Sequence, residues 1–294
     1  MDDNEFLARR FEAHRTHLRA VAYRMLGSLS EADDAVQETW FKLHRSDTSE
    51  VENLGGWLTT VVGRVCLDML RSRSSRREDP LEEPVRLPDP IISGAAGVDP
   101  EHEVLLADSV GPALLVVLEA LTPAERLAFV LHDLFGVPFA EIAPVVGRTP
   151  AAARQLASRA RRRVRGAAPA PDPDVVKQRE VVDAFLAAAR DGDFDGLVAL
   201  LDPDIVVRSD GGTLRPGGLV RGAAAVAGGA IFAARFAEVS RPALVNGAAG
   251  VVATTDGQPV SVMAFTISGG RIASIDILND PERLGRLDLT VLDG

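Results

Sequence analysis

Arginine is the residue type that most clearly could do chemistry in this sequence. Six arginines lie close together near the middle of the chain: Arg154, Arg159, Arg161, Arg162, Arg163 and Arg165. A guanidinium group can bind a phosphate or a guanine edge through two parallel hydrogen bonds. Arginines crowded on one short helix repel one another unless a polyanion neutralises them. The cluster therefore predicts a nucleic-acid contact despite the net charge of −10, although a solvated helix face is the alternative.

The residues around this cluster predict a helix-turn-helix. The first helix would begin at Thr122-Pro123-Ala124-Glu125, where Thr122 and Glu125 form a capping box. It would end at Gly136; a second helix spans Pro138 to Val146, and Gly147 turns the chain into Thr149-Pro150. In such motifs the start of the last helix enters the major groove. The candidate DNA contacts are Thr149, Ala151, Arg154, Gln155, Ser158, Arg159, Arg161, Arg162 and Arg163. A helical hairpin that never touches DNA is the alternative.

Three amphipathic segments at the N-terminus predict a small helical bundle. Apolar residues recur at helical spacing from Leu18 to Leu26, from Ala32 to Leu43 and from Leu58 to Met69. Ser30 is the expected N-cap of the second helix. The outer side of that helix is acidic, and the third helix carries Arg64, Asp68 and Arg71 on one face.

Two segments rich in proline and small residues divide the chain into modules. The first is 78–107, in which repeated prolines forbid a helix, and the second is Gly166 to Pro173. The modules are therefore 1–77, 108–166 and 174–294. In the last, a helix should end near Asp202-Pro203, and Ser268-Gly269-Gly270 predicts a hairpin turn between two strands. The expected fold is two all-α modules followed by an α+β domain with a curved antiparallel sheet.

The rarer reactive residues give little support for catalysis or metal binding. Cys66 is the one cysteine and lies in an apolar helical stretch, which excludes an internal disulfide and a thiolate zinc site. The N-terminus lacks a signal peptide, and no apolar run is long enough to span a membrane. We therefore expect a cytoplasmic protein with no catalytic residue, no metal and no cofactor.

Two stretches resemble regions 2 and 4 of the extracytoplasmic-function sigma factors. The first is AVAYRMLGSLSEADDAVQETWFKLHR followed by NLGGWLTTVVGRVCLDMLRSR, and the second is LTPAERLAFVLHDLFGVPFAEIAPVVGRTPAAARQLASRARRRVR. The resemblance covers most of residues 1 to 165. It implies a non-catalytic promoter-recognition subunit whose partners are promoter DNA and bacterial core RNA polymerase, at the beta-prime clamp and the beta flap, with no membrane contact.

The resemblance also implies roles for individual residues. The clamp would contact Asp33, Asp34, Gln37 and Glu38, unless that face is merely solvated. The melted −10 element would contact Asn53, Trp57, Arg64, Asp68, Arg71 and Arg73, with a flipped base in a pocket. Trp57 could equally be a core residue. Region 4 would read the −35 element as duplex.

The third module resembles the SnoaL-like cone, which in one group of sigma factors regulates activity in cis. The linker motif Pro84–Pro90 has Arg86 in place of tryptophan, Asp210-Gly211-Gly212 matches the start of a DGGGK motif, and Asn279–Leu284 resembles an NPDKL-type motif with an inserted acid. We expect these stretches to touch one another. The implied regulatory residues are Leu87, Pro88, Asp89, Asp210, Gly211, Gly212, Asn279, Asp280, Pro281 and Leu284. An ordinary turn is the alternative for Asp210-Gly211-Gly212.

Two other function classes stay open at this point. SnoaL-like cones also host isomerases and cyclases, but all five histidines precede this module and its acids show no spacing typical of a catalytic dyad. A ligand-responsive repressor would need only one helix-turn-helix and a sensor, which leaves the N-terminal bundle unexplained. A small ligand in the cone is compatible with either class.

Overall fold

The computed structural model describes residues 3–46, 51–76, 85–94, 112–167, 169–212, 215–232, 239–287 and 289–292. The chain forms two compact units. Unit 1 comprises Met1–Leu81, Pro100–Asp108 and Val117–Ala167. Unit 2 comprises Glu82–Asp99, Ser109–Val116 and Ala168–Gly294. No helix among the described residues is both long enough and apolar enough to span a membrane.

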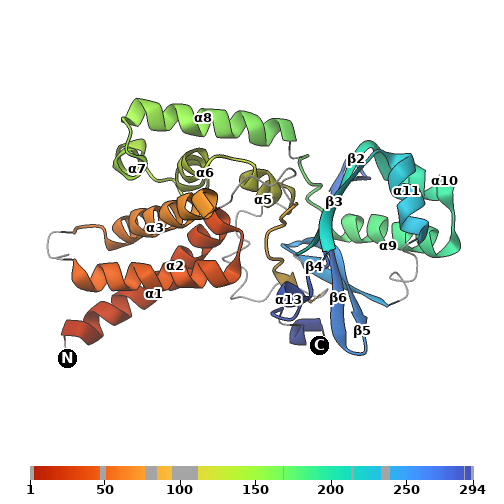
Figure 1. The fold of residues 1–294 in the computed structure, drawn as a ribbon, viewed down its shortest axis with the longest axis horizontal. Helices are drawn as coiled ribbons and strands as arrows, with labels where there is room; N and C mark the ends of the chain where they lie inside the picture. The colour runs from red at the N-terminus through yellow and green to blue at the C-terminus, as the bar shows by residue number, and fades with distance from the viewer. Residues whose placement is uncertain are drawn as a thin grey trace. The chain divides into compact units, whose positions relative to one another are not determined.

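Unit 1 begins with the predicted three-helix bundle (Figure 1). Its helices are α1 (Asp3–Leu26), α2 (Leu29–Arg45) and α3 (Leu54–Arg76), and each packs against the other two. The predicted N-cap of α2 is wrong: the cap is Ser28, and Ser30 already lies in the first turn. Gly27 ends α1 with a φ of 68°, so α2 starts only two residues later, earlier than the apolar pattern indicates.

The helix-turn-helix of unit 1 has the predicted starts and turns. Helix α6 (Pro123–Phe129) follows α5 (Pro112–Glu119), starts with the complete Thr122–Glu125 capping box and continues as a π-helical turn, η1 (Val130–Leu134). Helix α7 (Phe139–Val146) precedes α8 (Pro150–Ala167). Gly136 and Gly147 have φ values of 68° and 67°. Glycine fits these turns because other residues adopt positive φ only with strain.

A buried arginine connects the bundle to the helix-turn-helix. Arg126 is 2% exposed. It donates hydrogen bonds to the Leu118 carbonyl at 2.6 Å and the Met25 carbonyl at 2.7 Å. It also pairs with Glu119 at 3.0 Å, so the buried guanidinium is compensated by both charge and hydrogen bonds.

Unit 2 is built on a seven-stranded sheet in the order β1-β4-β5-β6-β7-β2-β3. The strands are β1 (Ile92–Ser93), β2 (Leu201–Gly211), β3 (Arg215–Arg221), β4 (Ser240–Val245), β5 (Ala248–Thr255), β6 (Gln258–Ser268) and β7 (Arg271–Leu278). All neighbours are antiparallel except β2 and β7, which run parallel. The sheet is therefore mixed and mostly antiparallel. Gly269 and Gly270 form the predicted turn between β6 and β7.

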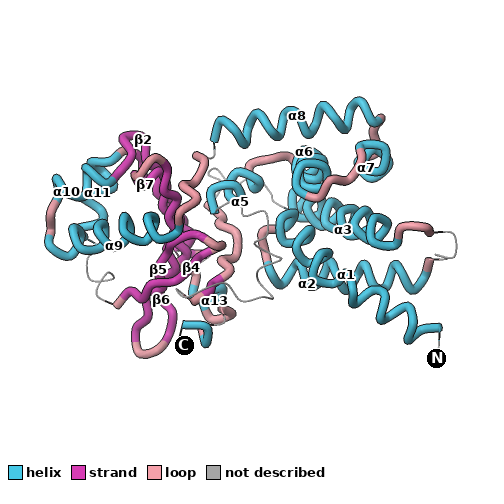
Figure 2. Tube along the Cα trace, turned by 180° about the vertical axis from the view of Figure 1, so that it is seen from behind, coloured by secondary structure: helices cyan, strands magenta, loops and turns pink. Residues whose placement is uncertain are grey.

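The two faces of the sheet have different covers (Figures 1 and 2). Helices α9 (Val175–Asp191), α10 (Phe194–Leu200) and α11 (Ala223–Phe232) pack on one face around Phe185 and Phe265. The other face, named the outer face, packs against α13 (Pro281–Leu284) and the 3-10 turn η2 (Thr290–Leu292), and Ile92 of the edge strand β1 joins the same core. Both faces are buried, so the sheet has two cores.

The helix predicted to end near Asp202-Pro203 ends two residues before that pair, directly at the start of a strand. Helix α10 ends at Leu200, and β2 already begins at Leu201. Leu201 pairs with Ile272, and the register of β2 against β7 shifts between Leu201 and Val206. A bulge of this kind lets a strand accept Pro203, which a regular ladder position would not.

Candidate nucleic-acid interface and linker seat

Helix α8 exposes the predicted DNA contacts on one side. Ala153, Ala157 and Ala160 are fully buried on the other side. The exposed positions are Thr149, Ala151, Arg154, Gln155, Ser158, Arg159, Arg162 and Arg163, and Arg161 is half-buried. Thr149 caps the helix by accepting a hydrogen bond from the Ala152 backbone at 3.2 Å. The helix start is therefore fixed, and the side chains that follow it point outward.

The arginines of α8 differ in what holds them. Arg154 lies over the Phe139 ring, 5.5 Å from its centroid. Arg161 pairs with Asp133. Arg163 pairs at 2.8 Å with Glu125, whose side chain is 6% exposed. Among the residues that the structure describes, Arg162 has no ion-pair partner. Its guanidinium is therefore more available to a phosphate than those of Arg161 and Arg163, which are paired.

Helix α3 brings five of the six predicted −10 contacts onto one stripe. Asn53 caps the helix by accepting a hydrogen bond from the Gly56 backbone at 3.0 Å. The half-buried Trp57 lies one turn further on, and three exposed side chains continue the stripe: Arg64, Asp68 and Arg71. Arg73 does not join them, because it faces the other way and pairs with Glu31 of α2.

The acidic face of α2 is exposed as predicted, at Asp33, Asp34, Gln37 and Glu38. Asp33 pairs with Arg19 at 2.7 Å, and Glu38 pairs with Lys42 at 3.4 Å. Phe41, which was not predicted as part of this surface, is 44% exposed on the same face. An aromatic residue three positions after Glu38 on a polar face was the signal that could have identified it.

Chemistry of other kinds has little support in the described part of the chain. No group of three or more His, Cys, Asp or Glu side chains there could hold a metal ion. Cys66 is fully buried, and this burial raises the pKa of its thiol far above the ordinary value. The thiol therefore stays protonated and unreactive at neutral pH.

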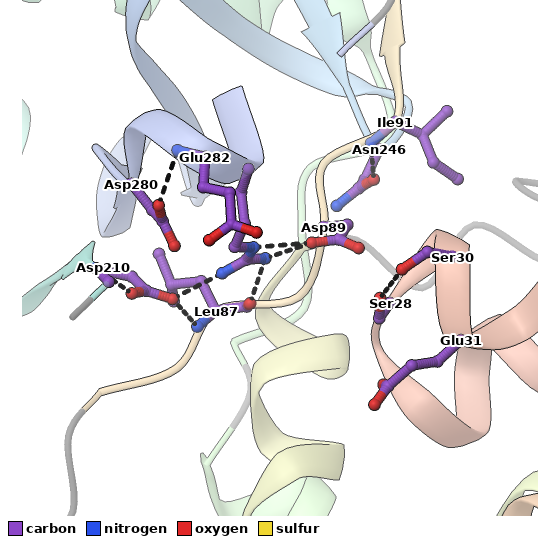
Figure 3. A network of polar contacts seen from close by, with 12 residues as sticks. Ser28, Ser30, Glu31, Leu87, Asp89, Ile91, Asp210, Asn246, Asp280 and Glu282 are labelled. Atoms are coloured by element: carbon purple, nitrogen blue, oxygen red, sulfur yellow. Dashed lines mark hydrogen bonds and ion pairs between the residues drawn. The ribbon is translucent and has the colours of Figure 1, made fainter. Parts of the chain in front are cut away.

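A network of hydrogen bonds in unit 2 holds part of the predicted linker on the outer face of the sheet (Figure 3). The Asp210 carboxylate, at the end of β2, accepts hydrogen bonds from the Leu87 backbone at 2.9 Å and from Arg283 at 2.7 Å. Arg283 of α13 also donates to the Asp89 carboxylate at 2.8 Å and to the Leu87 carbonyl at 2.7 Å. We call Asp210, Arg283 and the linker residues Leu87 to Asp89 the linker seat.

The turn after Asp210 is shaped by the C-terminal tail. Gly212 has a φ of 66°, and a Cβ atom there would lie 2.5 Å from the Asp280 carboxylate. Its backbone donates to Asp210 at 3.1 Å, and the Asn279 backbone donates to the Asp210 carbonyl at 2.7 Å. Only glycine fits position 212, because both the backbone angle and the available space exclude a side chain.

The linker continues across the outer face as part of the sheet. Its path begins beside Gly217 of β3, where an added Cβ would lie 3.1 Å from the Val85 carbonyl. Ile91 exchanges two hydrogen bonds with Asn246, and β1 then pairs with β4. The predicted linker 78–107 is thus ordered at 85–94, and its remaining residues lie outside the described part. The strand was missed because Pro88 and Pro90 obscure any alternating pattern.

The predicted regulatory residues therefore have distinct places. Asp210 binds the linker, Gly211 and Gly212 form the turn, and Leu284 packs in the outer-face core with Leu278. Asp280 caps α13, which begins with Pro281. Arg283, which contacts both sides of the seat, was missed. The sequence carries no direct signal for Arg283, because the burial of Asp210, which calls for a cationic or hydrogen-bonding partner, is seen only in the structure.

Two family models match the helical part of the chain. Sigma-70 region 2 matches residues 10–76, and Sigma-70 region 4 matches residues 112–164. These are the bundle and the helix-turn-helix of unit 1, with the first turns of α5 included.

Relatives cover nearly the whole chain. The sigma factor SigJ of Mycobacterium tuberculosis is 40% identical over 297 residues, which is 93% of this chain and 91% of the relative. The probable sigma factor SigI of the same species is 36% identical over 98% of both chains. The crystal structure of M. tuberculosis SigJ aligns with a TM-score of 0.76 at 35% identity, covering 95% of this chain and 98% of that one. The likeness therefore extends through unit 2.

Proposed function

We propose that this chain, which belongs to the extracytoplasmic-function family of RNA polymerase sigma factors, regulates itself through the linker seat of its C-terminal domain. Members of this family are not enzymes: they bind core RNA polymerase and promoter DNA and direct transcription initiation. The proposal adds a regulator in cis, in which the seat holds residues 85–94 and competes with polymerase for them. A cytoplasmic location is part of the proposal.

The exposed surfaces of unit 1 support particular roles in initiation. We assign −35 reading to the first turns of α8, because Arg154, Gln155 and Ser158 are exposed next to a capped helix start. We assign −10 binding to the α3 stripe from Asn53 to Arg71. The acidic face of α2 with Phe41 at its edge suits the beta-prime clamp, because it pairs charge with an apolar anchor. We expect the helix-turn-helix to contact the beta flap of polymerase.

One observation carries the regulatory proposal: the Arg283 guanidinium binds the linker and the domain together. Its side chain is 14% exposed, and the Asp210 side chain is 7% exposed. Charge pairs screened this little from one another keep much of their attraction, and the loss of one partner leaves an uncompensated buried charge. The seat can therefore hold residues 85–94 in one path until a competing partner takes them.

The competition needs only a modest free energy. A coupling of about 1 to 3 kcal/mol between two states changes an equilibrium by roughly 5- to 150-fold. Polymerase binding would shift the linker only to the extent that polymerase prefers the released path. Because the domain is joined to the same chain, the seat acts at high effective concentration without tight binding.

The test is run-off transcription with core polymerase and equal concentrations of each sigma variant. Arg283→Gln removes the charge that joins the two sides, so we expect a several-fold higher product yield with unchanged promoter preference. Arg286→Gln is the matched control, because Arg286 lies in the same tail, is 62% exposed and, within the described part of the chain, forms an ion pair with Glu282 alone. It should leave the yield unchanged.

Two further proteins extend the comparison. A chain that ends after Leu278 lacks Arg283 and should behave like Arg283→Gln. A Leu87→Ala, Pro88→Ala double variant weakens the linker side of the same seat and should also raise the yield. Equal yields from all of these proteins and the wild type would remove the regulatory proposal and leave the sigma-factor function intact.

A further inference from the structure

The π-helical turn η1 places two neighbouring side chains against the two helices that follow it. A turn with i→i+5 hydrogen bonds has more residues per turn than an α-helix, so consecutive side chains diverge less. His132 of η1 stacks on Phe139, the first residue of α7, with ring centroids 3.8 Å apart and 30° between the ring planes. The next residue, Asp133, pairs with Arg161 of α8. Adjacent residues of η1 therefore contact α7 and α8.

The His132 ring is fixed in this position by the turn that follows η1. Its Nδ1 atom lies 3.0 Å from the Val137 carbonyl oxygen. A carbonyl oxygen only accepts, so Nδ1 carries the hydrogen of this bond and donates it. The Val137 backbone in turn donates to the Leu131 carbonyl at 2.8 Å, which holds the acceptor in place. The ring cannot turn away from Phe139 without losing its hydrogen bond.

Phe139 extends this stack to α8. Its side chain is half-buried, and the guanidinium carbon of Arg154 lies 5.5 Å from the centre of its ring. A cation within about 6 Å of an aromatic face is attracted to it. Arg154 is exposed and has no carboxylate partner among the described residues, so the ring is the contact that restrains it.

An aromatic ring restrains an arginine differently from an acid. The carboxylates of Asp133 and Glu125 occupy N–H donors of Arg161 and Arg163. A ring attracts the guanidinium through its face and leaves the N–H donors free. A guanine edge needs two of these donors in one orientation, and ordering a free arginine side chain at the moment of binding costs affinity. Arg154 is thus restrained before binding and still able to donate.

We propose that His132 and Phe139 are positioning residues for −35 reading, and that their stack holds Arg154 ready to bind a guanine edge in the major groove. His132 acts through Phe139 and Arg154 and makes no base contact of its own. This inference rests on the assignment of −35 reading to α8 and adds to it a residue that sets base preference from outside that helix.

The test is holoenzyme binding to duplexes randomised at the −35 positions, and the readout is the ratio of affinities for guanine and the other bases at each position. Arg154→Ala identifies the position at which the guanine preference is lost. At that position, His132→Ala and Phe139→Leu should each lower the preference by about two- to tenfold, the cost of ordering one side chain on binding. His132→Phe keeps a ring for the stack and should keep the preference close to that of the wild type. A smaller folded fraction does not change a ratio of affinities.

A double variant and a matched control complete the test. In the Arg154→Ala background, His132→Ala should change the preference no further, because it acts only through that arginine. His17→Ala is the control: it removes another histidine ring, which packs edge-on against Phe135 directly after η1, and should leave the preference unchanged.

The outcomes separate the inference from the assignment beneath it. A wild-type preference in His132→Ala or in Phe139→Leu would overturn the inference alone. A further loss in the double variant, or a loss in His132→Phe as large as in His132→Ala, would do the same. If Arg154→Ala changes no position, the assignment of Arg154 as a base reader fails and the inference fails with it.

Discussion

Arginines of helix α8 and of the linker seat both pair with acids, those of α8 with Asp133 and Glu125 from neighbouring segments, but the two regions hold these charges differently. On α8, Arg154, Gln155 and Arg162 are exposed. In the linker seat, the side chains of Arg283 and Asp210 are nearly buried and pair with each other. Both also form hydrogen bonds with the backbone of Leu87. An exposed arginine can exchange water for phosphate at little cost, whereas a buried one is committed to its partner. The first arrangement suits binding to another molecule, and the second suits holding one part of the chain on another.

The largest expected effect tests whether ion pairs in the linker seat contribute more to the free energy of unfolding than those of α8. Asp210→Ala removes the acceptor for Leu87, Gly212 and Arg283, so we expect the free energy of unfolding to fall by about 3 to 5 kcal/mol. Asp133→Ala is the control, because it breaks a pair in which the Arg161 side chain is 35% exposed and can be solvated, so it should cost about 1 kcal/mol or less. Urea unfolding at neutral pH measures both. Similar costs for the two variants would remove the distinction between the regions.

The same difference explains what could be predicted from sequence. The capping box, the glycine turns and the buried alanine side of α8 are set by residues within a few positions of one another, so periodicity and turn chemistry predict them. The seat joins Asp210 to Leu87 and Arg283 to Asp89, which are distant in sequence. No spacing rule links such residues. The family resemblance pointed to the stretches but not to the arginine that connects them.

Strand order was beyond prediction for a related reason. Strand β1 is two residues long and pairs with β4. Strand β2 pairs in parallel with β7, although β3 to β6 lie between them in the sequence. Alternation of apolar residues also fails here, because both faces of the sheet are covered. The hairpin with the Ser268-Gly269-Gly270 turn was predicted, while β3 and α11 were not.

A smaller effect is expected from base readers on α8. Arg154→Ala or Gln155→Ala should cost about 1 to 3 kcal/mol at one position of the −35 element and relax the preference there. Arg154 also lies over Phe139, so Gln155→Ala is the cleaner of the two variants. The measurement is holoenzyme binding to promoters that differ at single −35 positions. A uniform loss over all sequences would mean that neither residue reads a base.

The smallest effect separates two neighbouring arginines by what holds them. Arg162→Ala should weaken all promoters alike and reduce the slope of log affinity against log salt by about 0.9, the value for one lost phosphate contact. Arg163→Ala should reduce the slope by less, because Arg163 already pairs with the nearly buried Glu125, and a phosphate would have to displace that partner. Arg163→Ala should instead lower stability, since Glu125 would keep its capping bond but lose its counter-charge. Salt titrations of holoenzyme binding, together with urea unfolding of the free sigma variants, measure both quantities. If Arg163→Ala lowers the slope fully without a loss of stability, the Glu125 pair is released on DNA at no cost, and the arginines of α8 are held as loosely as their exposure indicates.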